Sequence, residues 1–436
     1  MSGLLFGNYA EDADAGWQGH GKGNWGMSIL DALTARIAAA DEEEDLEGGR
    51  GTRTGADAKR AAKRAAERAA SATVRHVAGC DGPVPIACQE QATLPAAVAA
   101  AKDADATIVV LGLAFNKHCE PPGGGNIVAE DYCEREGTDR AFIELPAGQA
   151  KLVLALRAAM PAGKPLIGVM VHGGAIALGK DVIGALDALV DAWQPGIGGG
   201  EAVAGALFGD FSPSGRSPVT WYNSTADLPP LGHMGLYPVA ATAALNNGED
   251  RAGGGSAGMA VGDGPSNNTK GITYRYYEGS AVQFPFGFGL SGYTTFEYGP
   301  TLVVNATKVK PCEGIGVTVN VSNTGKMDSD EVVQLYVTMP RATVPAPLVR
   351  LAAFERVHVK AGETVAVSLV IAPEAHTVVL EDPAPGSDFV FTNSASVMVE
   401  EGELRIFVGG GQPGFAQSGV QASVAVTGTA ALASCG

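Results

Sequence analysis

The sequence predicts an α/β sandwich with a mostly parallel sheet, followed by an all-β sandwich domain. Between residues 92 and 221, helical patterns alternate with continuous apolar runs, which is typical of parallel strands covered by helices on both faces. Beyond residue 300 the apolar residues recur with a period of two, which is typical of strands with one buried face. The length of 436 residues is sufficient for two or three domains.

The residues before position 92 form the least regular part of the sequence. Residues 28–40 predict a short amphipathic helix with Ser28 as its N-cap. Residues 56–72 predict a helix rich in Ala and Arg, which we interpret as part of a solvated insertion over residues 41–72, with binding to an anionic partner as the alternative.

Continuous apolar runs at residues 106–113 and 165–172 predict fully buried strands, and residues 190–193 predict a shorter third strand. Helices are expected around these strands at residues 94–104, 149–160, 183–189 and 200–208. In a parallel sheet, functional residues lie on the loops beyond the carboxyl ends of the strands. Such loops are expected at residues 114–146, 172–180 and 194–200.

The second half of the chain changes in character. Residues 222–296 are rich in Gly, Pro and Asn, and we expect mostly loop there, with an insertion over 239–270. Alternating strands are predicted at residues 316–322, 331–337 and 364–370. The predicted organisation is therefore an α/β domain over 1–296, a β-sandwich over 297–410 and a flexible tail over 411–436.

The composition excludes several function classes. The 30 Lys and Arg against 47 Asp and Glu give a net charge of −17, which argues against a nucleic-acid binder. Arg157 and Lys164 interrupt the longest apolar candidate, so no membrane span is predicted. The histidines lack a ligand spacing with Cys or Asp, so we expect no metal and no other cofactor. The glycine run at 196–200 lacks the Lys-Ser/Thr of a phosphate-binding loop, which disfavours a flavodoxin-like nucleotide binder.

The cysteines and glycosylation signals bear on the compartment. Local disulfides Cys80–Cys88 and Cys119–Cys133 are one interpretation of the six cysteines, and free buried thiols are the other. Acceptor sequences for N-glycosylation occur at Asn223, Asn267, Asn305 and Asn320. The first ten residues lack the basic start and apolar stretch of a secretory signal. We interpret the chain as a mature secreted protein without its leader, or as one cut from a longer chain.

The most informative segment is Glu134-Arg-Glu-Gly-Thr-Asp-Arg140, in the long loop after the first predicted strand. Two carboxylates and an Asp–Arg pair on such a loop suit general acid–base catalysis, in which an acid must reach a leaving oxygen. A charged loop that is simply solvated is the alternative interpretation.

This segment, with Leu145-Pro-Ala-Gly-Gln after it, resembles the E-x-E-G-x-D-R and L-P-x-x-Q motifs of glycoside hydrolase family 3. Further motifs of that family follow in order at His172-Gly-Gly-Ala, Trp193-Gln-Pro-Gly, Leu207-Phe-Gly-Asp and Phe284-Pro-Phe-Gly. Arg350-Leu-Ala-Ala-Phe-Glu resembles the family's fibronectin type III-like domain. The resemblance extends to about residue 410, and Thr220-Trp-Tyr is most similar to plant-type β-xylosidases and arabinofuranosidases.

The resemblance implies a retaining exo-glycosidase acting on a carbohydrate substrate, in which one carboxylate attacks the sugar and a second serves as acid, then as base. Glu134 aligns with the acid/base residue, and Glu136 is the runner-up. Asp139 and Arg140 are expected to order the loop and set its local charge, with an ordinary surface ion pair as the alternative. His172 is expected either to approach a substrate hydroxyl or to be a structural histidine.

In this family the nucleophile is an Asp on an N-terminal barrel, and we find no barrel-length segment before Gly7. The nucleophile is therefore expected on a barrel domain from a longer or separate chain. The principal interpretation is the C-terminal part of a secreted, glycosylated β-xylosidase-like enzyme of xylan catabolism, located outside the cell or in the cell wall. The alternative is a non-catalytic carbohydrate-binding or scaffold protein that has lost the barrel.

Overall fold

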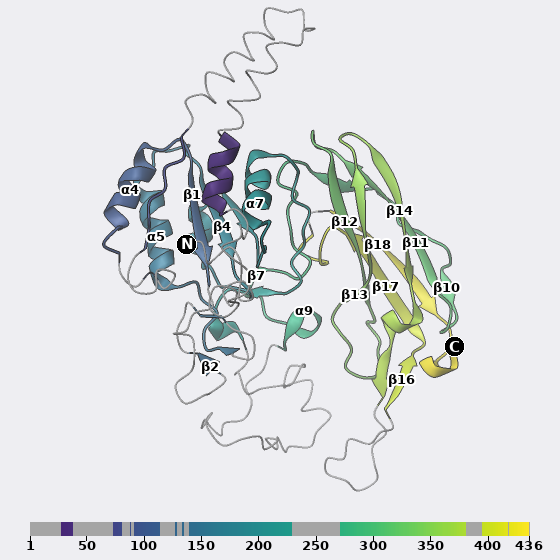
Figure 1. Cartoon of the computed structure of the whole chain (residues 1–436). Helices are drawn as coiled ribbons and strands as arrows, with labels where there is room; N and C mark the ends of the chain where they lie inside the picture. Colours follow the sequence, from purple (N-terminus) through teal and green to yellow (C-terminus); the bar gives the residue numbers. More distant parts are fainter. Residues whose placement is uncertain are drawn as a thin grey trace, which may run out of the picture. The chain divides into compact units, whose positions relative to one another are not determined.

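The computed structural model describes residues 28–37, 73–80, 88, 91–113, 127–128, 133–134, 139–228, 271–380, 395–416 and 418–435. The chain divides into two compact units (Figure 1). The first contains the described residues up to Asp210 together with Asn223–Thr225, and the second contains Phe211–Tyr222 and the described residues from Ala226 onward. The insertions expected over 41–72 and 239–270 lie outside the described residues.

A three-stranded parallel sheet in the order β1-β4-β5 forms the centre of the first unit. Its strands are β1 (Thr107–Gly112), β4 (Leu166–Val171) and β5 (Ala188–Asp191). Parallel registers join β1 to β4 along their whole length and β4 to β5 along four residues. Five of the six residues of β4 are buried, which is why this strand is a continuous apolar run. The predicted parallel sheet is confirmed.

Helices pack around this sheet, as Figure 1 shows, and they are α4 (Leu94–Asp103), α5 (Ala147–Ala159), α6 (Lys180–Ala185) and α7 (Gly199–Phe208). A further helix over residues 29–37 begins at Ser28, whose Oγ accepts the backbone N–H of Asp31 at 3.0 Å. The predicted N-cap is confirmed. Ile29 and Leu33 of this helix pack with Val169 of β4 in one buried cluster.

The helix predicted over residues 183–189 is shorter than expected and begins earlier, because its second half enters β5. The carboxylate of Asp187 accepts the backbone N–H of Leu166 at 2.8 Å, and the N–H of Asp187 donates to the carbonyl of Leu166 at 2.9 Å. These bonds attach residue 187 to the start of β4, so the chain is extended there and continues as a strand.

The second unit is a β-sandwich, as predicted. Its larger sheet has the order β10-β18-β17-β12-β13, and its smaller sheet has the order β14-β11-β8 with β9 also on β11. The strands are β8 (Phe296–Tyr298), β9 (Val303–Val304), β10 (Lys308–Val309), β11 (Ile315–Asn323), β12 (Ser329–Thr338), β13 (Arg350–Val359), β14 (Thr364–Ile371), β17 (Gly402–Gly409) and β18 (Gly419–Val426). Alternate residues of β11, such as Val317 and Val319, enter a core shared by both sheets.

Short elements complete the second unit, and one of them, η4, begins at Thr225 of the first unit. They are β6 (Trp221–Tyr222), η4 (Thr225–Asp227), α9 (Thr273–Tyr276), β7 (Val282–Phe284), η5 (Pro373–His376), β15 (Val378–Leu380), β16 (Ser396–Val399), β19 (Ala430–Ala431) and η6 (Leu432–Cys435). β6 pairs with β7, so a short strand is present at residues 282–284, inside the region 222–296 that was predicted to be mostly loop. The remaining described residues of that region are mostly loop, as expected.

The prediction of a flexible tail over residues 411–436 is wrong. β18 lies between β10 and β17 in the larger sheet, and Val424 and Val426 are buried in the sandwich core. The disulfide Cys312–Cys435 joins η6 to the turn between β10 and β11. The strand was missed although Val420, Ala422, Val424 and Val426 alternate with Gly, Gln, Ser and Ala, because this short run stands among small and polar residues.

The predicted disulfide Cys80–Cys88 is present in the first unit. The predicted pair Cys119–Cys133 has one member, Cys119, outside the described residues, so it stays a prediction; Cys133 is fully buried. The distant pair Cys312–Cys435 was not predicted, because pairing across 123 residues cannot be read from spacing.

Replacing both Cys312 and Cys435 by serine is expected to lower the free energy of unfolding of the sandwich by about 2–4 kcal/mol. The cross-link closes a loop of 123 residues and so restricts the unfolded chain. Guanidinium denaturation of the second unit measures the loss. Replacing Cys80 and Cys88 by serine is the control, since that disulfide lies in the first unit and should leave the sandwich transition unmoved. An unchanged sandwich midpoint in the Cys312/Cys435 variant would contradict the prediction.

Candidate functional site

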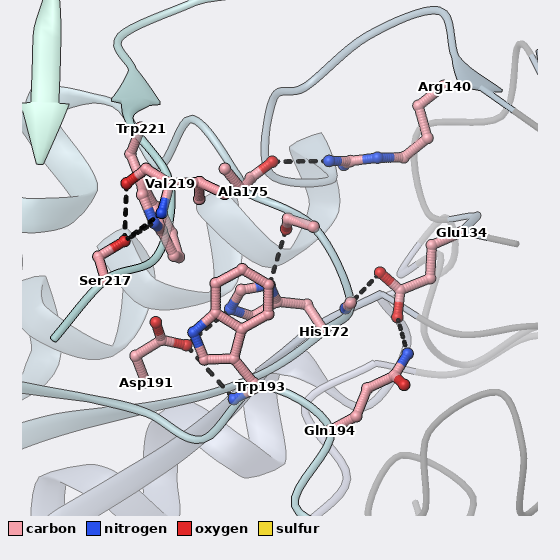
Figure 2. A network of polar contacts seen from close by, with 12 residues as sticks. Glu134, Arg140, His172, Ala175, Asp191, Trp193, Gln194, Ser217, Val219 and Trp221 are labelled. Atoms are coloured by element: carbon pink, nitrogen blue, oxygen red, sulfur yellow. Dashed lines mark hydrogen bonds and ion pairs between the residues drawn. The ribbon is translucent and has the colours of Figure 1, made fainter. Parts of the chain in front are cut away.

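The carboxyl ends of β4 and β5 carry a cluster of polar side chains (Figure 2). β4 is followed by His172, and β5 ends at Asp191, with Trp193 and Gln194 just beyond. The backbone N–H of His172 donates to the carbonyl of Trp193 at 3.1 Å. Because parallel neighbours end at the same edge of a sheet, their terminal residues meet there. We call residues 172–175 the β4 loop.

Glu134 binds the β4 loop directly. Its Oε2 accepts a hydrogen bond from the backbone N–H of Gly173 at 2.5 Å, and its Oε1 accepts one from Nε2 of Gln194 at 3.4 Å. The glutamate is only 7% exposed. A Cβ at position 173 would lie 3.2 Å from both carboxylate oxygens and 2.6 Å from the Gln194 amide, so this approach requires glycine.

Arg140 binds the same loop from β3 (Asp139–Arg140), a strand that pairs in parallel with β2 (Ile127–Val128). Its Nη2 donates to the carbonyl of Ala175 at 2.6 Å, as Figure 2 shows. Burial lowers the pKa of the Arg140 guanidinium, and the nearby charges of Glu134 and Glu144 oppose that shift. The guanidinium therefore supplies positive charge to the surroundings of Glu134. We call residues 133–140, which carry both side chains, the acidic segment.

His172 is fully buried, and both of its ring nitrogens have partners. Nδ1 lies 2.7 Å from the carbonyl oxygen of Gly174, and Nε2 lies 2.7 Å from Oδ1 of Asp191. The ring of Trp193 lies 5.0 Å from the imidazole ring at 39°. This geometry fits a structural histidine. A contact of His172 with a substrate hydroxyl stays a prediction.

The other predicted site residues are less constrained by the structure. Asp139 is exposed, and the runner-up Glu136 lies outside the described residues. The structure thus brings Glu134, Arg140 and His172 together around the β4 loop. Asp191 and Gln194 belong to the same cluster and were missed by sequence reasoning. The sequence does offer a signal for both: Asp191 is a charged residue within the predicted strand over residues 190–193, and Gln194 is the first residue of the loop after it.

Glu144 is a further, partly buried carboxylate, and it was not among the site residues predicted from the sequence. Thr225 donates to both of its oxygens, through the backbone N–H at 2.7 Å and the hydroxyl at 2.6 Å. Burial alone would raise the pKa of Glu144, but hydrogen bonds from Thr225 and from the backbone of residues 143 and 144 together outweigh burial and lower it. This carboxylate therefore stays ionised and anchors the chain before α5.

Within the described residues, no group of three or more His, Cys, Asp or Glu side chains is placed to hold a metal ion. None of the described helices combines the length and the apolar composition that crossing a membrane requires. The cluster offers a carboxylate held by hydrogen-bond donors, a guanidinium near it, and a buried histidine paired with the partly exposed Asp191. Carboxylates at the end of a parallel sheet are suited to acid–base or positioning roles.

Comparisons with known families match both parts of the chain. The model of the glycosyl hydrolase family 3 C-terminal domain matches residues 3–292, and that of the fibronectin type III-like domain matches residues 331–412.

Individual relatives agree. The chain is 32% identical to a periplasmic beta-glucosidase of Salmonella typhimurium, over 72% of this chain and 36% of that protein. It is 37% identical to a xylan 1,4-beta-xylosidase of Xylanibacter ruminicola, over 55% and 23%, and 31% identical to beta-D-xylosidase 1 of Arabidopsis thaliana, over 70% and 37%. The structure of a family 3 beta-glucosidase of Bifidobacterium adolescentis is 25% identical with a TM-score of 0.62, over 97% of this chain and 48% of that one. The chain therefore spans less than half of each of these proteins.

Proposed function

The chain belongs to glycoside hydrolase family 3, and we propose that it supplies the acid/base carboxylate of a retaining exo-β-glycosidase. The family membership predicted from the motifs is confirmed by the family models and the relatives. The observation that carries the proposal is the docking of the acidic segment on the β4 loop through Glu134. This contact places Glu134 at the carboxyl edge of the parallel sheet, where functional residues gather, and Glu136 follows it by two residues in the sequence.

In the proposed reaction an Asp on a barrel domain, which a longer or separate chain would provide, attacks the anomeric carbon. The acid of the acidic segment gives its proton to the departing glycosidic oxygen, so a covalent glycosyl-enzyme forms and the aglycone leaves as an alcohol. The same residue, now a carboxylate, removes a proton from water, which displaces the Asp. The sugar is released with its original configuration, and the acid recovers its proton.

The two glutamates of the acidic segment are not equivalent. The register of the family motif favours Glu134 as the acid/base residue. Its surroundings favour another role: Glu134 is 7% exposed, its oxygens accept hydrogen bonds from Gly173 and Gln194, and Arg140 lies nearby. Both oxygens of a buried carboxylate held in this way are occupied by N–H donors, whereas a general acid must reach the leaving oxygen of the substrate. We therefore assign proton transfer to Glu136 and positioning to Glu134.

The proposed substrates are terminal β-xylosyl residues of plant-type polysaccharides or oligosaccharides. Support comes from the relatives named as xylosidases in Xylanibacter ruminicola and Arabidopsis thaliana. The relatives named as beta-glucosidases make β-glucosides the competing substrate class. Parallel assays with nitrophenyl β-xyloside and β-glucoside separate the two.

We also propose that the protein acts outside the cell or in the cell wall as a glycoprotein. Disulfides persist in oxidising compartments, and two are present among the described residues, Cys80–Cys88 and Cys312–Cys435. The acceptor Asn320 is exposed on β11, where an enzyme could attach a glycan.

The test is hydrolysis of an aryl β-xyloside by the 436 residues alone and by the same residues fused to the barrel of a family 3 β-xylosidase. We expect negligible turnover from the chain alone, because acid catalysis by itself contributes about 10²–10⁴-fold. The fusion should hydrolyse the xyloside and release β-xylose first, observed by proton NMR before mutarotation. Release of α-xylose would contradict a retaining mechanism. A soluble fusion that binds xylo-oligosaccharides without cleaving them would favour the non-catalytic carbohydrate-binding alternative.

A further inference from the structure

We propose that His172 and Asp191 form a positioning pair that holds the β4 loop in the conformation in which Gly173 binds Glu134. The pair acts through the backbone, and neither side chain needs to touch substrate. The positioning of the β4 loop by this pair does not depend on the proposed function. Only the expected effect on turnover rests on it.

The backbone of the β4 loop is fixed at its beginning and at its end. At its beginning, the N–H of His172 donates to the carbonyl of Trp193 at 3.1 Å. At its end, the carbonyl of Ala175 accepts from Arg140 at 2.6 Å. Between these points the imidazole of His172 reaches the carbonyl of Gly174 at 2.7 Å. This bond closes a small ring over the intervening peptide groups and so orients the Gly173 N–H, which donates to Glu134.

The partners of His172 determine where its protons lie. Nδ1 faces a backbone carbonyl, which only accepts, so Nδ1 carries a proton. Nε2 lies 2.7 Å from Oδ1 of Asp191, so this second ring nitrogen is held by the carboxylate group while Nδ1 binds the loop. The Asp191 side chain is 31% exposed, whereas that of His172 is fully buried. Asp191 therefore fixes the imidazole in the orientation that Gly174 requires.

Three substitutions of His172 separate the two bonds. Asn places an amide N–H near the position of Nδ1, so it preserves the bond to Gly174 and loses the contact with Asp191. Gln reaches the position of Nε2, so it preserves the contact with Asp191 and loses the bond to Gly174. Phe fills the same space and loses both. A role in packing alone predicts that Phe is the best tolerated of the three.

The experiment is hydrogen–deuterium exchange at the Gly173 amide in the 436-residue chain. We expect exchange about 10-fold faster in His172→Gln and His172→Phe, since the bond that orients the amide is lost. His172→Asn should exchange at close to the wild-type rate. In Asp191→Asn the Gly173 amide should also exchange at close to the wild-type rate, because the Asn side chain still offers Nε2 of His172 a hydrogen-bond partner. In Asp191→Leu this partner is lost, and the Gly173 amide should exchange faster.

Val153→Ala is the matched control, because Val153 is fully buried in α5, outside residues 172–175, and its truncation destabilises the first unit. Exchange at Gly173 in the histidine variants must exceed exchange in this control. Equal exchange rates of the Gly173 amide in Val153→Ala and in His172→Gln would overturn the proposal. Exchange in His172→Asn as fast as in His172→Gln would overturn it as well.

The effect on turnover is measured in the barrel fusion. A displaced Glu134 moves the acidic segment, and a misplacement of about 1 Å can cost up to about 10²-fold in rate. We expect His172→Gln to lower kcat while KM stays near its wild-type value, with partial recovery in His172→Asn. If the wild-type fusion is inactive, the proposed function fails, and the exchange result at Gly173 still decides on the positioning pair.

Discussion

Replacing Glu136 by alanine in the barrel fusion is expected to slow the hydrolysis of a β-xyloside with a poor leaving group by about 10²–10⁴-fold. Such a substrate needs its glycosidic oxygen protonated as the bond breaks. A dinitrophenyl xyloside needs little protonation, so its first step should be nearly unchanged and the glycosyl-enzyme should accumulate. Steady-state rates on substrates with leaving groups of graded acidity measure the difference.

The matched variant is Glu134→Ala, two positions along the same segment. Its loss of turnover should be the same for good and poor leaving groups, because it displaces the acidic segment from Gly173 without removing the proton donor. Glu134→Gln keeps an acceptor for the Gly173 N–H and should recover part of the rate. If the leaving-group dependence appears in the Glu134 variant and not in the Glu136 variant, the two roles are reversed and the motif register was correct.

Glu331→Leu is expected to lower the free energy of unfolding of the second unit by about 3–5 kcal/mol, the usual effect of breaking a buried ion pair. Arg216 Nη2 lies 2.6 Å from Glu331 Oε2, and the side chains are 10% and 2% exposed. The hydroxyl of Tyr298 donates to the other carboxylate oxygen at 2.8 Å. Removing the carboxylate leaves the guanidinium of Arg216 buried without its counter-charge. Urea denaturation of the second unit measures the loss.

The double variant Arg216→Met/Glu331→Leu is expected to recover much of this stability, because no uncompensated charge is then buried. Glu403→Gln is the control, since Glu403 forms its ion pair with Arg405 on the exposed face of the same sheet and should leave the midpoint nearly unchanged. A loss in Glu331→Leu no larger than in Glu403→Gln would contradict the importance of the buried pair.

The same carboxyl group gives the second unit a pH dependence. Burial raises the pKa of Glu331, and the charge of Arg216 opposes that shift. A carboxyl group with a raised folded-state pKa binds more protons in the folded than in the unfolded chain between the two pKa values. Its contribution to stability is therefore complete below the unfolded value of about 4.3 and declines as the pH rises through the folded value. In Glu331→Gln this slope should disappear from the pH profile of the unfolding free energy.

Much of the fold could be predicted from local pattern. β4 is a continuous apolar run because both of its faces are buried, and β11 alternates because one face enters the sandwich core. β18 was missed although its valines alternate, because it stands in a stretch of small and polar residues and its burial depends on its place between β10 and β17. The disulfide Cys312–Cys435 depends on that same long-range arrangement.

The candidate site, like the fold, could be predicted where local sequence pattern defines it and not where long-range contacts do. Glu134, Arg140 and His172 were found because each lies in a motif on a loop after an apolar strand. Asp191 was missed because its role depends on β5 lying beside β4, and strand order is not visible in the sequence. The role of Glu134 as an acceptor for a backbone N–H likewise depends on a contact across 39 residues.

The central claim, that the acidic segment provides the acid/base carboxylate, is tested most directly by the product that forms in the presence of azide. With dinitrophenyl β-xyloside and the Glu136→Ala fusion, a small anion attacks the glycosyl-enzyme without needing a base. The account predicts rate recovery and β-xylosyl azide, identified by NMR, from Glu136→Ala, with neither from the wild type nor from Glu134→Ala. Failure of every acidic-segment variant to form glycosyl azide, while an active wild-type fusion hydrolyses the substrate, would contradict the claim.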